Sequence, residues 1–342
     1  MVQTSQTNII RRDTAEARQI RCVVSGMRPT GALHLGHYCG ALQSWVDLQT
    51  QAQQCFFMVA DLHALTTADD VATIAPSVEE MVRDWLAVGI DPTKAVIFRQ
   101  SAVPAHAELA LLLAMHTPLS WLERNPTYKE MAADYPDHVN LGLLGYPVLQ
   151  TADIVLYGAD AVPVGEDQLP HLELGREIIR RMNQRFKTKL VEPKAFLQPT
   201  ARIVGLDGQA KMSKHLDNYI ALADSSDVIQ KKLRRVQTDV GTASGRTTKS
   251  PTIQALFLLL ELFSRDAVTT FERQYQEGTI RYQALKDHLA QAIAERLAPI
   301  RERRARYSSR QIRDVLAEGS GRAAGVANET LKQVKQAMGL TS

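Results

Sequence analysis

Two histidines stand in a glycine-containing stretch near the start of the 342-residue chain. His34 and His37 lie three residues apart within 29–38 (Pro-Thr-Gly-Ala-Leu-His-Leu-Gly-His-Tyr), so they would share one face of a first helical turn. Gly31 and Gly36 permit tight turns and a close approach of the backbone to a ligand. Imidazoles beside a helix N-terminus suit the negative charge that develops on a phosphate. The alternative is an ordinary strand–turn–helix unit with surface histidines.

Two lysines form a second candidate, far downstream. Lys211 and Lys214 lie in 210–215 (Ala-Lys-Met-Ser-Lys-His), after the glycine-flanked turn 205–208 (Gly-Leu-Asp-Gly). This composition predicts a mobile loop that offers two point charges to a polyphosphate. Taken alone, such a loop is a solvated surface.

The elements around the histidines predict an α/β sheet. Apolar runs at 22–26, 55–60, 95–98 and 161–165 predict buried strands, and helices are expected between them at about 75–88 and 105–116. This alternation predicts a doubly wound parallel sheet with right-handed crossovers. Ligands bind at the carboxyl ends of the strands in such sheets, and the histidine stretch lies at such an end.

An acid stands on an otherwise apolar helix at about 143–157. Tyr146, Gln150 and Asp153 follow the spacing i, i+4, i+7 and therefore share one polar face. Burying a lone carboxylate is costly, so Asp153 needs a partner. The alternative is a partly exposed amphipathic face.

Composition indicates an ordinary soluble protein, with 45% apolar and 23% charged residues. No stretch approaches the roughly 18 uncharged apolar residues of a membrane span, and we expect no membrane contact. The polar residues 1–19 lack the apolar core of a secretory signal, so we expect a flexible extension of a cytoplasmic protein. Cys22, Cys39 and Cys55 predict reduced, buried thiols, and without a Cys-x-x-Cys pair we expect no resident metal.

The last third of the chain predicts a basic helical domain. Segments at about 225–236, 252–265, 267–276, 279–318 and 321–338 have helical spacing, with breaks at Pro251, Gly278, Gly319 and Gly325. From Ser225 onward, 20 lysines and arginines face 12 acids, a net of +8, whereas the first 224 residues carry 20 against 25, a net of −5. Such an imbalance favours an anionic partner, although a solvated helical surface has the same composition.

Four stretches together resemble the bacterial tryptophanyl-tRNA synthetases, a branch of the class I aminoacyl-tRNA synthetases. The first two are His34-Leu35-Gly36-His37 and Lys211-Met212-Ser213-Lys214, where the following residue is His215 rather than the usual serine. The others are 146–154 (Tyr-Pro-Val-Leu-Gln-Thr-Ala-Asp-Ile) and 162–168 (Val-Pro-Val-Gly-Glu-Asp-Gln). The resemblance spans about 20–340.

The resemblance implies three domains. Residues 1–19 are the flexible extension, 20–205 a Rossmann-like catalytic domain with a connecting insertion at about 122–140, and 206–342 the mobile lysine loop with a helical anticodon-binding domain.

It also implies roles for the site residues. His34, His37, Lys211 and Lys214 stabilise phosphate charge and are the catalytic set. The ATP site is expected to comprise Arg28, Pro29, Thr30, Gly36, His37, Gly165, Glu166, Asp167, Val204, Lys211, Met212, Ser213, Lys214 and His215. The tryptophan site is expected to comprise Asp153, which would accept the indole N–H, with Tyr146, Gln150, Gln168, Val162 and Val164 around it.

The implied activity is a tryptophan–tRNA ligase of protein biosynthesis. L-Tryptophan reacts with ATP, which carries Mg²⁺, and the resulting adenylate passes its tryptophan to tRNA(Trp). A symmetric homodimer is also implied by the resemblance, and nothing else in the sequence indicates it.

Three other readings stay open. A tyrosyl-tRNA synthetase shares both signatures and differs in the residues after Val164. A nucleotidyltransferase can use a His-x-Gly-His element without tRNA, but such enzymes are commonly shorter and lack a basic helical part. A non-catalytic paralogue is the third, and the intact histidines and lysines argue against it.

Overall fold

The computed structural model describes residues 8–11, 14, 16–68, 70–134, 136–197, 203–214, 216–238 and 249–341. These form two compact units. The first comprises Met1–Gly31, Ser44–Pro199 and Ser308–Ser342, and the second Ala32–Gln43 and Thr200–Tyr307.

The first unit is built on a six-stranded sheet in which every pair of neighbours is parallel. Its order is β1-β6-β5-β2-β3-β4. The strands are β1 (Ile9–Arg11), β2 (Cys22–Met27), β3 (Gln54–Val59), β4 (Val96–Arg99), β5 (Ala161–Val164) and β6 (Lys194–Leu197). The chain runs from β2 through β3 to β4 on one side and from β5 to β6 on the other, where the N-terminal β1 lies at the edge beside β6. The strand order therefore reverses between β2 and β5. The predicted fold class, a doubly wound parallel sheet with a helical C-terminal part, is confirmed.

Alternation along the strands supplies two apolar faces. Phe56 and Met58 of β3 belong to one core cluster, together with residues of α5, α8, α9 and α14. Phe57 points the other way, where it stacks on Trp45 of α2, and Trp45 meets Trp85 of α4 edge to face. The helices of this unit are α2 (Gln43–Gln51), α3 (Asp61–Ala64), α4 (Ile74–Val88), α5 (Ala105–Ala114), α6 (Leu119–Glu123), α7 (Pro126–Asp134), α8 (Leu141–Val155), α9 (Leu169–Phe186) and α14 (Ser309–Ala337).

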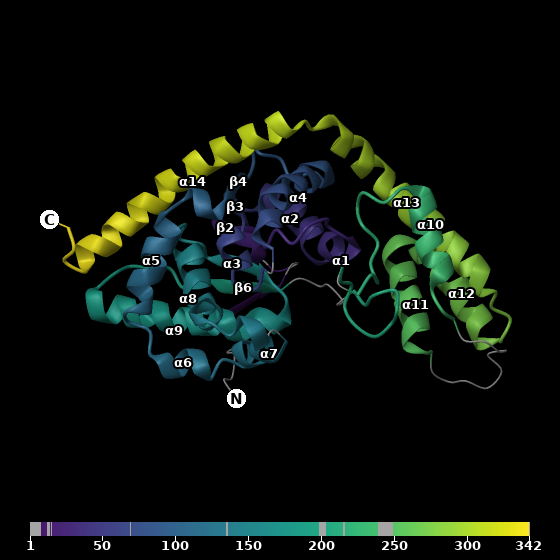
Figure 1. Cartoon of the computed structure of the whole chain (residues 1–342), viewed down its shortest axis with the longest axis horizontal. Coiled ribbons are helices and arrows are strands. Elements are labelled where there is room, and N and C mark those ends of the chain that lie inside the picture. Colours follow the sequence, from purple (N-terminus) through teal and green to yellow (C-terminus); the bar gives the residue numbers. More distant parts are fainter. Residues whose placement is uncertain are drawn as a thin grey trace. The chain divides into compact units, whose positions relative to one another are not determined.

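Helix α14 crosses the sheet unit beside β4, far from it in sequence (Figure 1). The predicted breaks at Gly319 and Gly325 are wrong, because α14 runs through both, and the break falls instead at Tyr307–Ser308, where Ser308 caps α14. Gly319 has a packing role, since a Cβ there would lie 1.8 Å from the carbonyl oxygen of Ile97 in β4. A glycine was therefore needed for contact rather than for a turn.

Two further segments differ from expectation. Ile9–Arg11, within the expected flexible extension, forms β1 and pairs with β6. The polar insertion at 122–140 is expected as a connecting segment, and it contains α7 and a 3₁₀ turn at Pro136–His138. Short strands without alternation and polar helices both lack a strong sequence signal.

The second unit is helical. It comprises α1 (Leu35–His37), which continues as a π-helical turn at Tyr38–Leu42, and α10 (Ser226–Arg235), α11 (Pro251–Phe263), α12 (Arg265–Gln276) and α13 (Tyr282–Arg306). Leu285, Leu289 and Ile293 of α13 are fully buried, and α13 packs against α10 and α11. No described helix has the length and apolar character that crossing a bilayer requires.

Candidate active site

The predicted site residues fall into two groups, one in each unit. His34, Gly36, His37, Val204 and Lys211–Lys214 belong to the helical unit. Arg28, Pro29, Thr30, Tyr146, Gln150, Asp153, Val162, Val164 and 165–168 belong to the sheet unit. His215 lies outside the described residues, as does the side chain of Asp167.

The histidine stretch is tied to the segment that follows the lysines. The N–H of Leu35 donates to the carbonyl of Ile220, and the N–H of Leu222 donates to that of Leu33, so these segments pair around His34 and Ala221. This pairing connects residues nearly 190 positions apart, and nothing in the sequence spacing indicated it. It brings the two predicted phosphate-binding motifs into one compact unit.

The two imidazoles accept hydrogen bonds from backbone N–H groups at the start of the short helix α1. The N–H of Gly36 donates to Nδ1 of His34 at 3.1 Å, and the N–H of His34 donates to Nδ1 of His37 at 3.2 Å. Their ring centroids are 3.9 Å apart. Because Nδ1 accepts in both rings, each neutral imidazole carries its proton on Nε2 and can donate it to a ligand.

Electrostatics keep both rings neutral. Burial, with the nearby charges of Lys214 and Lys211, lowers the pKa of His34 to about 4. Burial, His34 and the same lysines lower the pKa of His37 to about 3. A ligand at this cluster thus meets two cationic lysines and two neutral N–H donors, a combination that suits a polyphosphate.

The lysine loop is held by a residue that sequence reasoning missed. Asn218, buried to 4% exposure, accepts the N–H of Ser213 at 2.7 Å and donates to Asp207 at 3.0 Å. Gly205 is required beside it, because a Cβ there would lie 2.1 Å from the Asn218 amide nitrogen. Val204 and Lys211 form an antiparallel bridge, in which the N–H of Gly205 donates to the carbonyl of Ala210 and the N–H of Met212 donates to that of Ile203. These bonds do not use the N–H or carbonyl of Val204.

In the sheet unit, side chains gather at the carboxyl ends of four strands. Arg28 follows β2, His63 follows β3 and Gln100 follows β4, while Val162 and Val164 are buried in β5 itself. This edge is where the strand order reverses, as expected for a ligand site in such a sheet. Arg28 donates to Thr67 at 3.1 Å.

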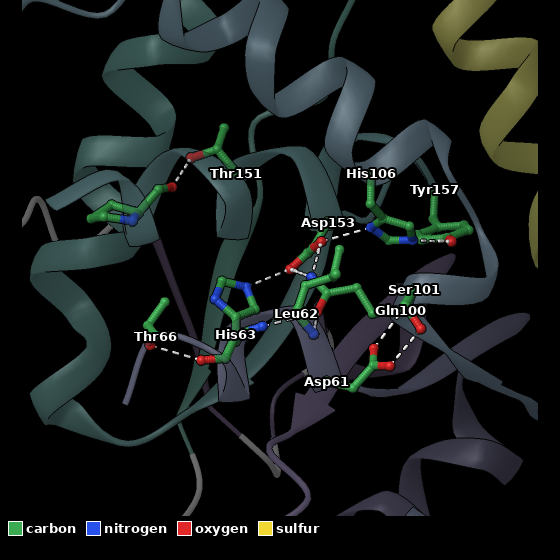
Figure 2. Close-up of polar contacts among 11 residues, drawn as sticks. Asp61, Leu62, His63, Thr66, Gln100, Ser101, His106, Thr151, Asp153 and Tyr157 are labelled. Carbon is green, nitrogen blue, oxygen red and sulfur yellow. Dashed lines mark hydrogen bonds and ion pairs between the residues drawn. The ribbon is translucent and has the colours of Figure 1, made fainter. Parts of the chain in front are cut away.

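Asp153 lies at the centre of this group, as Figure 2 shows. Its carboxylate is buried and receives Nε2 of His63 at 2.8 Å, Nε2 of Gln100 at 2.8 and 3.0 Å, and Nδ1 of His106 at 2.6 Å. Burial alone would raise the pKa of Asp153, but the hydrogen bonds from His106 and His63 outweigh it and hold that pKa well below its usual range. The predicted partner of the buried acid is therefore three side chains, none of which the sequence pattern had indicated.

Two buried acceptors beside Asp153 have no hydrogen-bond partner among the described residues. They are Nδ1 of His63 and Oε1 of Gln150. The ring of His63 lies 4.3 Å from that of Tyr146, and its Nε2 lies 2.8 Å from Asp153, so it contacts two side chains of α8 that belong to the predicted tryptophan site. Unpaired buried acceptors are expensive, and a ligand that carries N–H groups would satisfy them.

Among the described residues no group of three or more His, Cys, Asp or Glu side chains could hold a metal ion. Cys22, Cys39 and Cys55 are free and buried, and burial raises the pKa of each to about 12, so these thiols remain protonated.

Relatives share nearly the whole chain. Residues 16–298 match the family described as tRNA synthetases class I (W and Y). Proteins named tryptophan–tRNA ligase from Treponema pallidum and Thermotoga maritima are each 42% identical, over 94% and 93% of this chain and 97% and 99% of their own lengths. The crystal structure of Campylobacter jejuni tryptophanyl-tRNA synthetase complexed with ADP and tryptophan has a TM-score of 0.82 at 30% identity, covering 93% of this chain and 100% of that one. The chain therefore belongs to the class I tRNA synthetases of the tryptophan and tyrosine branch.

Proposed function

We propose that this chain is an ATP-dependent tryptophan–tRNA ligase. The observation that carries the proposal is the buried, ionised Asp153, which His63, Gln100 and His106 hold by hydrogen bonds, with unpaired buried atoms on His63 and Gln150. Such a site fits an amino acid whose side chain is a large apolar ring with one N–H. The names of the relatives support the same assignment.

Asp153 accepts the indole N–H of tryptophan in this proposal. Tyr146, Gln150 and Gln168 contribute polar contacts, and Val162 with Val164 form the apolar wall. The unpaired Oε1 of Gln150 and Nδ1 of His63 are suited to the donors of the α-ammonium group. His63 thereby joins the proposed tryptophan site.

ATP is bound through its charge and its ribose. His34, His37, Lys211 and Lys214 are proposed to contact the phosphates, and the backbone of Val204 to contact adenine. Arg28, Pro29, Thr30, Gly165, Glu166 and Asp167 complete the proposed ATP site, with Gly36, Met212, Ser213 and His215. Mg²⁺ is proposed to arrive with the phosphates, which supply its oxygen ligands.

The chemistry needs no protein base. The carboxylate of tryptophan is already a nucleophile and attacks the α-phosphate, forming tryptophanyl-adenylate and releasing pyrophosphate. The two Nε2–H donors and the two lysines stabilise the charge that develops on the phosphates. A hydroxyl of the terminal tRNA ribose then displaces AMP from the adenylate and takes the tryptophan.

A tRNA is the proposed partner of the helical unit. Lys231, Arg234 and Arg235 are exposed on one face of α10, whose opposite face buries Ile229 and Leu233. Such a cationic face can contact phosphates, and single-stranded anticodon bases are expected to be read by side chains near it.

A homodimer is proposed through the sheet unit. Leu111, Met115, Leu119 and Leu141 are 57–82% exposed on α5, α6 and α8 and in the loop after α5, and exposed apolar groups of this size are typical of interfaces. Sedimentation of the protein should give twice the chain mass of 38.0 kDa, whereas sedimentation at 38.0 kDa would refute the dimer.

Charging of tRNA tests both steps of the proposed reaction together. Purified protein, ATP, Mg²⁺ and bacterial tRNA should incorporate labelled tryptophan and should not incorporate labelled tyrosine. Lys211→Ala combined with Lys214→Ala should abolish charging while the protein stays folded by circular dichroism. Charging with tyrosine would reassign the amino-acid site, and charging that survives loss of both lysines would refute their role.

A further inference from the structure

Behind Asp153 lies a buried chain of two more side chains (Figure 2). Nδ1 of His106 is 2.6 Å from Oδ1 of Asp153, and Nε2 of the same ring is 2.7 Å from the phenolic oxygen of Tyr157. His106, on α5, is 0% exposed, and Tyr157, just after α8, is 5% exposed. The sequence pattern had assigned no role to either residue.

The order of donors along this chain follows from Tyr157. Burial and the charge of Asp153 raise the pKa of the Tyr157 phenol, so it keeps its proton. Its O–H donates to Nε2 of His106, which fixes the neutral ring as the Nδ1–H tautomer and directs that N–H at Asp153. The chain therefore delivers one oriented, charge-assisted hydrogen bond to the carboxylate.

Gln100 fixes the carboxylate from a second direction. Its Oε1 accepts the N–H groups of Leu62 at 3.1 Å and His63 at 3.4 Å, so the amide can be oriented in only one way. Its Nε2 then bridges both oxygens of Asp153. With His63 on Oδ2 and His106 on Oδ1, three side chains hold the carboxylate from three directions and fix its orientation.

We propose that His106, held in one tautomer by Tyr157, is a positioning residue that orients Asp153 and keeps it ionised for the indole N–H of the substrate. The proposal rests on the function proposed above, in which Asp153 accepts that N–H. It assigns the selectivity for an N–H to a relay of three buried residues rather than to Asp153 alone. His106 itself does not contact the substrate.

If His106 and Tyr157 had a packing role alone, a different experimental result would be expected. The rings of His106 and Tyr157 lie against Phe98, at 5.9 and 5.4 Å between centroids, and Tyr157 also stacks on Phe56 at 4.4 Å. If these rings only filled space, replacing them would weaken all substrates alike. If they position Asp153, the loss is confined to substrates that present an N–H.

The experiment compares two amino acids in ATP–pyrophosphate exchange. One is tryptophan, and the other is 3-benzothienylalanine, whose bicyclic ring has a sulfur in place of the N–H. His106→Leu should lower kcat/KM for tryptophan by roughly 10- to 100-fold and change that for the analogue by less than about threefold. His106→Asn, whose amide can still donate from near the Nδ1 position, should restore most of the ratio between the two. An equal loss for both substrates, or no rescue by asparagine, would overturn the proposal.

Tyr157→Phe is the milder variant, because it keeps the stacked ring and removes only the O–H. It should shift the tryptophan-to-analogue ratio in the same direction, by roughly three- to tenfold. A ratio equal to that of the wild type would overturn the role of Tyr157.

The pH profile supplies an independent readout. Without the His106 donor the pKa of Asp153 rises, so tryptophan kcat/KM of His106→Leu should fall on acidification from about pH 8 to 6, and analogue kcat/KM should not. His63, Gln100, Tyr146 and Tyr157, which also surround Asp153, are unchanged between the two proteins. Parallel profiles for both substrates would contradict the proposal.

Asp153→Ala, which removes the acceptor altogether, separates this proposal from the one on which it rests. If that variant keeps the tryptophan-to-analogue ratio, Asp153 is not the acceptor and both proposals fail. If it loses the ratio while His106→Leu keeps it, only the relay fails.

Discussion

Burial lowers the pKa values of the two histidines in the helical unit, whereas it acts to raise the pKa of Asp153 in the sheet unit. It lowers the pKa of His34 to about 4 and that of His37 to about 3, which leaves two neutral donors near two lysines. It also opposes ionisation of Asp153, yet hydrogen-bond donors reverse its effect and keep that acid charged. The neutral histidine donors suit a polyphosphate whose charge is already balanced by the lysines. The fixed charge of Asp153 suits the selection of a ligand with a single N–H.

The histidine pair should be visible in a pH titration. Between about pH 6.5, the usual pKa, and about pH 4 the folded chain binds fewer protons than the unfolded one, so stability falls as pH falls through this window. Nuclear magnetic resonance should show the ring signals of His34 and His37, assigned with His34→Asn and His37→Asn, unshifted from pH 8 to 5. Titration of either ring near pH 6.5 would contradict the burial argument.

Replacing Asp153 should separate the two substrates. Asp153→Ala leaves His63, Gln100 and His106 without their acceptor and removes the partner of the indole N–H, so kcat/KM for tryptophan should fall by at least about 100-fold. The KM for ATP should stay within about threefold, because the proposed phosphate contacts are unchanged. ATP–pyrophosphate exchange measures both kinetic constants, and equilibrium dialysis measures the affinity for tryptophan, which would refute the assignment if it were unchanged.

Sequence spacing identified site residues only where several of them lie close together within one helix or loop. Tyr146, Gln150 and Asp153 recur along α8, and the histidine and lysine pairs each lie within four residues. His63, Gln100 and His106 come one each from separate segments and have no spacing signal of their own. Asn218 was missed for the same reason, although the loop it holds was recognised.

Among the elements, helix α14 depends on Gly319 for its contact with β4. Gly319→Ala would place a methyl group 1.8 Å from the Ile97 carbonyl oxygen, which is backbone and cannot rotate away. The free energy of unfolding of the sheet unit should fall by roughly 1–3 kcal/mol, measured by urea denaturation.

The same helix offers the control. Gly321 has nothing within 4 Å of a built Cβ, so Gly321→Ala should stabilise the protein by roughly 0.5–1 kcal/mol through helix propensity. Equal effects of the two substitutions would show that the packing of α14 on β4 is not as described.

Elements with a periodic or apolar signal followed from the sequence, and those without one did not. Helix α4 was expected at 75–88 and spans Ile74–Val88, and the four predicted strands fall where apolar runs had indicated. Strands β1 and β6 are three and four residues long and adjoin polar sequence. Their pairing stabilises them, and such tertiary contacts cannot be read from a local pattern.

At the scale of the whole molecule, each compact unit is formed by segments that are not contiguous in the sequence. Ala32–Gln43 belongs with Thr200–Tyr307, and Ser308–Ser342 belongs with the sheet. The expected limits at 205 and 206 followed composition along the chain. Contacts instead group segments that are distant in sequence, such as the pairing of Leu33 with Leu222.

The cationic face of α10 should matter for tRNA and not for activation. Lys231→Glu combined with Arg235→Glu should lower kcat/KM for tRNA in aminoacylation by about tenfold or more at low salt, with a smaller effect at high salt. ATP–pyrophosphate exchange should stay within about twofold. Lys94→Glu, an exposed charge reversal in the sheet unit, should leave both rates unchanged, and a loss of exchange in the α10 variant would contradict a role confined to tRNA.

The most direct test of the proposed function is ATP–pyrophosphate exchange, screened over all twenty amino acids in the absence of tRNA. It measures the activation step and its selectivity together. We expect exchange with tryptophan alone, at a rate that falls sharply in Asp153→Ala. Exchange with tyrosine, or none with any amino acid, would contradict the assignment of this chain as a tryptophan–tRNA ligase.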